Sequence, residues 1–112
     1  MKLITAIIRP EKLEDVTHAV VDAGARGMTV AEVRGFGQQY GQAPEASPVT
    51  GAPLMLRKVR IEVVVGDDRA EAVTDAIAKA VRTGTIGDGK IWVCRVTSAL
   101  RVRTGERDRD AV

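Results

Sequence analysis

The sequence predicts an α+β sandwich in which two helices pack on one face of a four-stranded antiparallel sheet, in the order β-α-β-β-α-β. Two segments with helical spacing of apolar residues each follow a strand-like segment, and Arg57–Val65 alternates between polar and apolar residues as a half-buried strand does. This order of elements is that of the ferredoxin-like split unit. At 112 residues the chain has the length of a single domain, residues 1–112.

The first strand and the first helix are predicted within residues 3–27. Leu3–Ile8 is a short run that is apolar on both faces of a strand. Pro10 then opens a helix whose apolar residues recur at helical spacing, namely Leu13, Val16, Val20 and Ala23. Gly24 and Gly27 end it. Because the first strand is apolar on both faces, the face without helices would stay exposed unless another copy covered it, and we expect a homo-oligomer.

A long segment separates the second strand, Met28–Arg34, from the third. From Gly35 to about Met55 no period is sustained, and the segment contains four glycines and three prolines. Such length is unusual for a connection inside a compact domain, where long loops are functional or disordered. We therefore expect the loop over about residues 36–56 to be either functional or disordered.

Asp67 or Asp68 is predicted to cap the second helix, since Asp68 and Glu71 have the spacing of a capping box. Gly84 has the character of the C′ residue that follows a helix. The fourth strand, Lys90–Val96, contains the single cysteine, Cys94, which we expect to fill the core. The charged tail over about residues 104–112 is expected to be mobile.

Composition argues against several functional classes. Seventeen basic and fifteen acidic residues give a formal charge of +2, which is too small for a nucleic-acid footprint. No run approaches the length of about 18 apolar residues needed for a membrane span, and the start of the chain lacks a signal-peptide pattern. We expect a cytoplasmic protein without nucleic-acid binding or membrane insertion. The lone Cys94 and lone His18 provide neither a disulfide nor a metal cluster.

A glycine-rich turn directly before the fourth strand is the candidate functional segment. Gly84, Gly87 and Gly89 precede Lys90, so bare backbone N–H groups and an ammonium are placed together, as suits a phosphate. The alternative is a plain helix end followed by a polar loop. The turn is not a P-loop, because Ile91 stands where Ser or Thr is required and the turn follows a helix instead of a strand.

Two arginines lie beyond the far end of the same strand. Arg101 and Arg103, spaced i, i+2 in an extended segment, direct two guanidiniums to one side. Within one subunit they would lie a strand length from the turn. Across a subunit interface the arginines and the turn could meet over one polyphosphate.

The whole chain resembles the PII signal-transduction proteins, the nitrogen regulatory P-II family. The matching segments are Thr83–Val93, Ile7–Pro10, Gly27–Val30, Val33–Gly37, Lys58–Glu62 and Arg101–Gly105. The resemblance implies a homotrimeric regulator, not an enzyme, that senses ATP or ADP together with 2-oxoglutarate. It also implies that the long loop is the T-loop, which contacts target proteins such as an ammonium transporter or an enzyme of nitrogen or carbon metabolism.

The resemblance also implies roles for individual residues. Those matching the nucleotide site are Ile7, Thr29, Gly35, Phe36, Gly37, Gln38, Glu62, Val64, Gly87, Asp88, Gly89, Lys90, Arg101 and Arg103. Those matching the 2-oxoglutarate site are Gln39, Lys58, Gly37, Gly41 and Gly87. Gln39 matches the residue that helps to hold Mg²⁺ with ATP and the effector. From the residues alone, a solvated strand face is the favoured interpretation of Lys58 and Glu62.

The T-loop departs from the family pattern at positions that matter for regulation. Gly51 stands at the position of the tyrosine that relatives modify by uridylylation, and Val49 replaces a serine that some relatives phosphorylate. We therefore expect a protein switched by ligands alone. Gln38 stands where relatives often carry an arginine, which leaves the preference among ATP, ADP and AMP open.

Three alternatives compete with this interpretation. An RNA-recognition domain shares the topology, but the aromatic residues on which bases stack are missing from the first and third strands. A phosphoryl-transfer enzyme would need more than Asp88 beside the phosphates. A divergent carbon sensor that binds bicarbonate with adenine nucleotides is kept open by the altered T-loop, although Gln39 and Lys58 argue against it.

Overall fold

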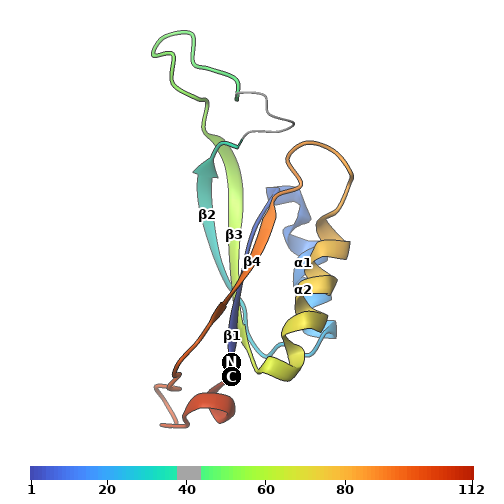
Figure 1. Cartoon of the computed structure of the whole chain (residues 1–112), viewed down its shortest axis with the longest axis vertical. Coiled ribbons are helices and arrows are strands. Elements are labelled where there is room, and N and C mark those ends of the chain that lie inside the picture. Colours follow the sequence, from blue (N-terminus) through green and yellow to red (C-terminus); the bar gives the residue numbers. More distant parts are fainter. Residues whose placement is uncertain (38–43) are drawn as a thin grey trace.

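The computed structural model describes residues 1–37 and 44–112 and confirms the predicted ferredoxin-like fold. Its elements are β1 (Lys2–Ile8), η1 (Pro10–Lys12), α1 (Leu13–Asp22), β2 (Thr29–Gly35), β3 (Leu56–Val65), α2 (Asp67–Val81), β4 (Lys90–Arg95) and η2 (Asp108–Ala111). The strands form one antiparallel sheet in the order β2-β3-β1-β4, and both helices lie on the same face of it (Figure 1).

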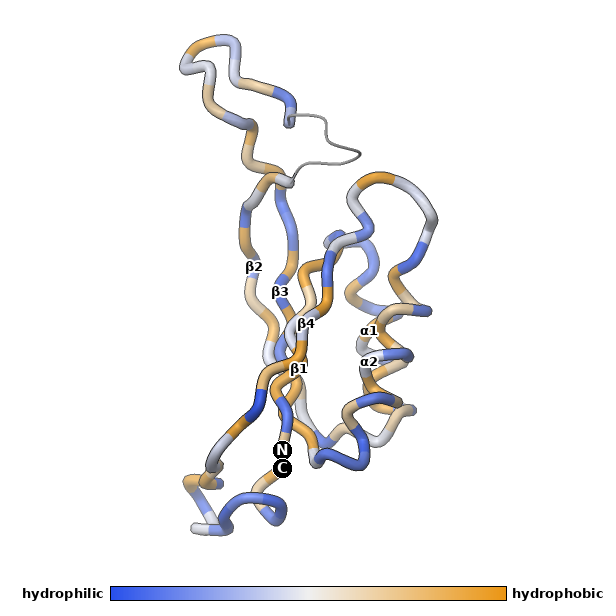
Figure 2. Tube along the Cα trace, viewed as in Figure 1, coloured by the Kyte–Doolittle hydropathy of each residue, from blue (hydrophilic) through white to orange (hydrophobic). Residues whose placement is uncertain are grey.

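The core lies between the sheet and the two helices. Ile4, Ala6 and Ile8 on the central strand β1 are fully buried, and they pair in register with the buried valine and isoleucine residues of β3. The helices contribute the other half of the core, namely Val16 and Val20 from α1 and Val73, Ile77 and Val81 from α2. Apolar residues accordingly concentrate along the strands, whereas η2 is hydrophilic (Figure 2). Burial of these alternating residues fixes the strand register.

The sheet face opposite the helices is incompletely covered. Leu3 and Ile7 on β1 are half-buried, and Val64 and Trp92 on the flanking strands are exposed. Cys94 pairs with Leu3 on this face and is exposed, so the prediction that it fills the core is wrong for the single chain. The alternation of β4 turns Cys94 away from the helices.

Helix α2 begins without the predicted capping box. Its N-cap residue is Gly66, which makes no side-chain capping bond, and the helix itself starts at Asp67. The Asp67 carboxylate instead accepts a hydrogen bond from the Met1 ammonium at 2.9 Å, which lowers the pKa of Asp67. Asp68 lies 3.3 Å from the guanidinium of Arg109. Both acidic side chains thus bind groups from the chain ends instead of their own helix.

The other end of α2 also differs from the prediction. The helix ends at Val81, and Arg82 already has an extended backbone. Gly84, which was predicted to be the C′ residue, has positive φ but lies two residues beyond the C-cap. Gly84 therefore shapes the following turn and does not terminate the helix.

The described part of the long loop is a narrow hairpin. Ser47 N–H donates to the Ala52 carbonyl at 2.7 Å, and Leu54 N–H donates to the Glu45 carbonyl at 2.8 Å. The hairpin extends β2 and β3 away from the body of the molecule (Figure 1). Gly51 at its tip has a φ of 71°, a conformation that glycine adopts without steric cost.

The C-terminal segment makes defined contacts, although the sequence suggested a mobile tail. Leu100 forms an isolated bridge with Arg107, and Asp108 N–H donates to the Ala99 carbonyl at 2.8 Å. The segment then turns into η2 and returns to α2 through the ion pair of Arg109. Its charged side chains form ion pairs within the segment and with α2. The charge pattern of the sequence alone does not reveal these pairs.

Two valines on helix α1 provide a direct test of this core. Val16 is fully buried, whereas Val21 is 63% exposed. Since both Val→Ala changes alter helix propensity equally, Val16→Ala should lower the free energy of unfolding by about 2 kcal/mol more than Val21→Ala does. Urea denaturation at one fixed protein concentration measures the difference, and equal losses would contradict the core described above.

Candidate functional site

The glycine-rich turn between α2 and β4 rests directly on the end of strand β1. Gly89 has a φ of 102°, and a Cβ atom added there would overlap the carbonyl oxygen of Ile7. A glycine is therefore required by both backbone conformation and space. The turn lies at the same end of the molecule as the long loop (Figure 1).

The Asp88 carboxylate holds this turn closed. It accepts hydrogen bonds from the backbone N–H groups of Thr83 at 2.8 Å and Gly84 at 2.9 Å, and another from the Thr83 hydroxyl. The Thr83 hydroxyl and amide bonds, with smaller help from the Gly84 amide and Arg9, lower the pKa of Asp88. The side chain of Asp88 is thus bonded within the turn. An anion that binds here would therefore contact the backbone N–H groups of the turn and not the Asp88 carboxylate.

Arg9, at the end of β1, ties the turn to the sheet. Its guanidinium donates to the hydroxyls of Thr83 at 3.3 Å and Thr85 at 3.0 Å, and also to the Ile86 carbonyl. It lies 3.6 Å from the Asp88 carboxylate, and only 22% of its side chain is exposed. A planar guanidinium with five donors suits this multiple contact.

Lys58, on β3, approaches the same turn. Its ammonium donates to the Gly87 carbonyl at 3.1 Å. In the described part of the chain, the backbone N–H groups of Gly87 and Asp88 donate to no protein acceptor. Lys90 is exposed at the start of β4. The turn therefore presents bare amides beside the Lys58 ammonium and directly precedes Lys90 in the chain, an arrangement that can bind an oxyanion.

The uncovered face of the sheet brings several sequence-predicted residues together. Ile7 pairs with Lys90, and Glu62 pairs with Thr29 across β2 and β3. Thr29, Glu62 and Val64 line a hollow of about 460 Å³, which also receives Arg101. One face thus runs continuously from the glycine-rich turn to this hollow.

The arginines beyond β4 lie far from the turn of their own subunit, as the sequence predicted. The glycine-rich turn and the C-terminal segment lie at opposite ends of β4 (Figure 1). Residues 102–104 form a turn, so the prediction of an extended segment here is wrong, and the i, i+2 argument for placing both guanidiniums on one side does not apply. Arg101 pairs with Glu106 at 3.0 Å and reaches the Ala111 carbonyl at 3.5 Å, while Arg103 is exposed. A single subunit therefore does not bring the arginines to the turn.

The predicted residues at the base of the T-loop are described only in part. Gly35 ends β2, and Phe36 and Gly37 follow it in an exposed position. Gln38, Gln39 and Gly41 lie outside the described residues. Their roles, including that of Gln39 toward Mg²⁺, stay predictions.

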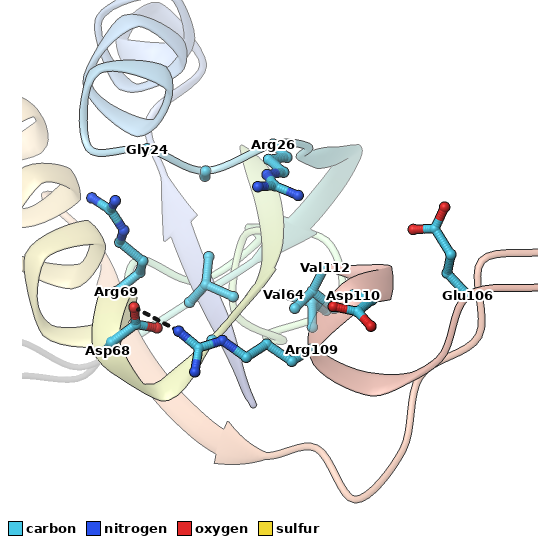
Figure 3. A pocket seen from close by; sticks show the side chains of 12 residues that line it. Gly24, Arg26, Val64, Asp68, Arg69, Glu106, Arg109, Asp110 and Val112 are labelled. Carbon is cyan, nitrogen blue, oxygen red and sulfur yellow. Dashed lines mark hydrogen bonds and ion pairs between the residues drawn. The ribbon is translucent and has the colours of Figure 1, made fainter. Parts of the chain in front are cut away.

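A second hollow, of about 510 Å³, lies between the α1–β2 connection, the start of α2 and the C-terminal segment (Figure 3). Three arginines and three acidic residues line it, namely Arg26, Arg69, Arg109, Asp68, Glu106 and Asp110. These charges balance, and the dashed contact in Figure 3 is the ion pair between Arg109 and Asp68. This hollow lacks the excess positive charge that would hold a free anion.

The described residues offer neither a metal cluster nor a membrane-spanning helix. Within residues 1–37 and 44–112, no three His, Cys, Asp or Glu side chains gather as a metal cluster. In the same ranges, no helix has the length and apolar character needed to cross a bilayer.

Sequence reasoning missed three residues that shape the site. Arg9 and Thr83 belong to matched segments, but only the fold shows that both hold Asp88. Arg60 forms an ion pair with Glu62 at 3.2 Å on the uncovered face. The i, i+2 spacing of Arg60 and Glu62 on one strand was a usable signal, because such residues share a face.

Sequence comparison with known proteins finds relatives that match the chain along its length. The family described as Nitrogen regulatory protein P-II matches residues 1–106. Nitrogen regulatory protein P-II of Synechocystis is 48% identical and that of Bradyrhizobium diazoefficiens 47% identical, and Nitrogen regulatory protein GlnK of Escherichia coli is 46% identical. Each alignment covers 100% of this chain and 100% of the relative.

Acid should open the glycine-rich turn. A carboxyl whose pKa falls on folding contributes stability that is present above its ordinary value of 3.8 and is lost as the pH falls through the lowered value. The amide proton resonances of Thr83 and Gly84 should therefore titrate together between about pH 5 and pH 2. NMR measures these shifts, and Asp88→Asn should abolish the titration. Unchanged shifts in the unsubstituted protein would contradict the role given to Asp88.

Gly89 and Gly84 form a matched pair for testing the contact with β1. Both have positive φ, but a Cβ at Gly84 would meet nothing within 4 Å. Gly84→Ala should cost about 1 kcal/mol from backbone strain alone, and Gly89→Ala at least about 2 kcal/mol because it also displaces β1. Denaturant unfolding compares them, and equal costs would show that the turn does not rest on Ile7.

Proposed function

The chain belongs to the nitrogen regulatory protein P-II family, and from that premise we propose that it reports the supply of adenine nucleotide and 2-oxoglutarate to target proteins. It is a signal-transduction regulator and not an enzyme. The family binds nucleotides and 2-oxoglutarate in general. The observation that carries the proposal for this chain is the glycine-rich turn, whose bare amides lie beside the Lys58 ammonium and directly before Lys90.

We propose that the nucleotide lies between two subunits of a homotrimer. The turn of one subunit would hold the phosphates through the backbone of residues 87–89 and through Lys90. Arg101 and Arg103 of the neighbouring subunit would supply two guanidiniums. The distance between turn and arginines within one chain supports this arrangement, since neither half alone surrounds a polyphosphate (Figure 1).

The uncovered sheet face supports oligomerisation. Leu3, Val64, Trp92 and Cys94 lie on this face and leave apolar area in contact with water. Such a patch is typical of an interface. Packing of copies on this face would also enclose the hollow beside Thr29, Glu62 and Val64, where we place the adenosine. Ile7 and the residues at the T-loop base, Gly35, Phe36, Gly37 and Gln38, would complete the nucleotide site.

We place the effector 2-oxoglutarate beside the same turn. Lys58 would pair with its distal carboxylate, and Gln39 and Mg²⁺ would hold its other end against ATP. Residues 37, 41 and 87 would contribute backbone groups. The position of Lys58, 3.1 Å from the Gly87 carbonyl, supports a carboxylate next to the phosphates, and a bicarbonate sensor is the alternative.

The T-loop would carry the signal to a protein target. Its described part is a hairpin whose tip holds Gly51 and the fully exposed Val49 instead of a tyrosine. We infer that the loop responds to ligands without uridylylation. An ammonium transporter or an enzyme of nitrogen or carbon metabolism fits the family as the target.

Calorimetry with a lysine variant tests the effector site. 2-Oxoglutarate should bind only in the presence of Mg²⁺ and ATP. Lys58→Ala should weaken 2-oxoglutarate at least about tenfold, because a charge-assisted hydrogen bond of about 1.5–3 kcal/mol is lost, while ATP binding persists. Lys79→Ala, an exposed change on α2, serves as the control. Full effector affinity in Lys58→Ala would refute the site, and bicarbonate binding in its place would support the alternative sensor.

A further inference from the structure

We propose that the base of the β2–β3 hairpin contains a second oxyanion site, built by Arg34 and Arg57 and separate from the nucleotide turn. The site would take a phosphate or carboxylate group of a small metabolite. The arrangement of two guanidiniums across neighbouring strands carries this inference.

Arg34 and Arg57 stand directly opposite each other in the antiparallel register of β2 and β3. Side chains at such positions have Cβ atoms about 5 Å apart, and like charges there destabilise the sheet. A bound anion converts this repulsion into attraction. The pair is therefore arranged as an anion site would be.

The carboxylates near Arg34 and Arg57 do not neutralise the two guanidiniums. Glu32 is the nearest carboxylate, 3.9 Å from Arg57, and both side chains are largely exposed, so this ion pair is weak. Within the described residues, Arg34 forms no ion pair or side-chain hydrogen bond. One weakly placed carboxylate thus faces two guanidiniums.

A hollow of about 450 Å³ lies beside the two arginines. It is lined by Pro10 from η1, by the two arginines and by their neighbours along the strands, namely Glu32, Val33, Lys58 and Val59. Of the charged residues on the sheet face that the pair occupies, two are the guanidiniums and one is the acidic Glu32. The volume accommodates a small anion, and the forked guanidiniums match the geometry of phosphate and carboxylate oxygens.

The site is distinct from the proposed nucleotide and effector sites. Arg34 and Arg57 share the sheet face of Glu32 and Val59, whereas Lys58 alternates to the other face toward Gly87. The hollow lies where β2 and β3 lead into the long loop. An anion held there would stiffen the base of the hairpin, so this site would bias the T-loop independently of ATP.

Arginine side-chain NMR on the full-length protein tests the proposal. Inorganic phosphate and malonate are titrated separately at constant ionic strength against chloride, and the Nε–Hε signals of Arg34 and Arg57 are followed. Saturable shifts of both signals support the site, and the anion that saturates identifies phosphate or carboxylate as the preferred group. Linear shifts equal to those in chloride would overturn it.

Variants separate this site from the nucleotide turn. Arg57→Gln should weaken the response of the Arg34 signal about tenfold, since one fork of a paired contact is lost. Arg82→Gln, on the exposed residue after α2, should leave it unchanged. Lys90→Gln should also leave it unchanged while ATP binding falls. A response lost in Lys90→Gln but kept in Arg57→Gln would assign the anion to the turn and overturn the second site.

Discussion

The close approach of the Gly89 backbone to the Ile7 carbonyl is the contact on which the site depends. It seats the glycine-rich turn on the end of the central strand, and only glycine permits it. Arg9 then reaches the turn from the next residue of the chain after β1, and Asp88 closes it from within. The bare amides are thereby fixed before any ligand arrives, which lowers the cost of ordering them on binding.

The sequence predicted the fold well because the periodic segments are strong. Arg57–Val65 alternates without interruption, and the two helices carry buried stripes of valine and isoleucine. The failures occurred where long-range partners override local preference. Asp68 looked like a capping residue but pairs with Arg109, and Cys94 looked apolar enough for the core but lies on the uncovered face. No local pattern encodes contacts between residues 41 positions apart.

The candidate site also combines residues that a local pattern reveals with residues that only the fold brings together. The glycines and Lys90 carry their chemistry in their spacing, so the turn could be predicted from sequence as a candidate anion site. The position of Lys58 beside Gly87 required the sheet register, which brings β3 to the end of β1. Arg34 and Arg57, 23 positions apart, become opposite residues only through the pairing of β2 with β3. The sheet topology, and not a sequence motif, places the two arginines opposite each other.

The central claim is that two subunits share each nucleotide site, and complementation between variants tests it most directly. Lys90→Gln removes the ammonium of one half, and Arg103→Gln removes a guanidinium of the other. Each variant alone should bind ATP weakly, whereas oligomers reassembled from a mixture should regain tight sites, because some interfaces then join an intact turn to an intact arginine segment. Calorimetry of the mixture that equals the sum of the two separate variants would contradict a shared site.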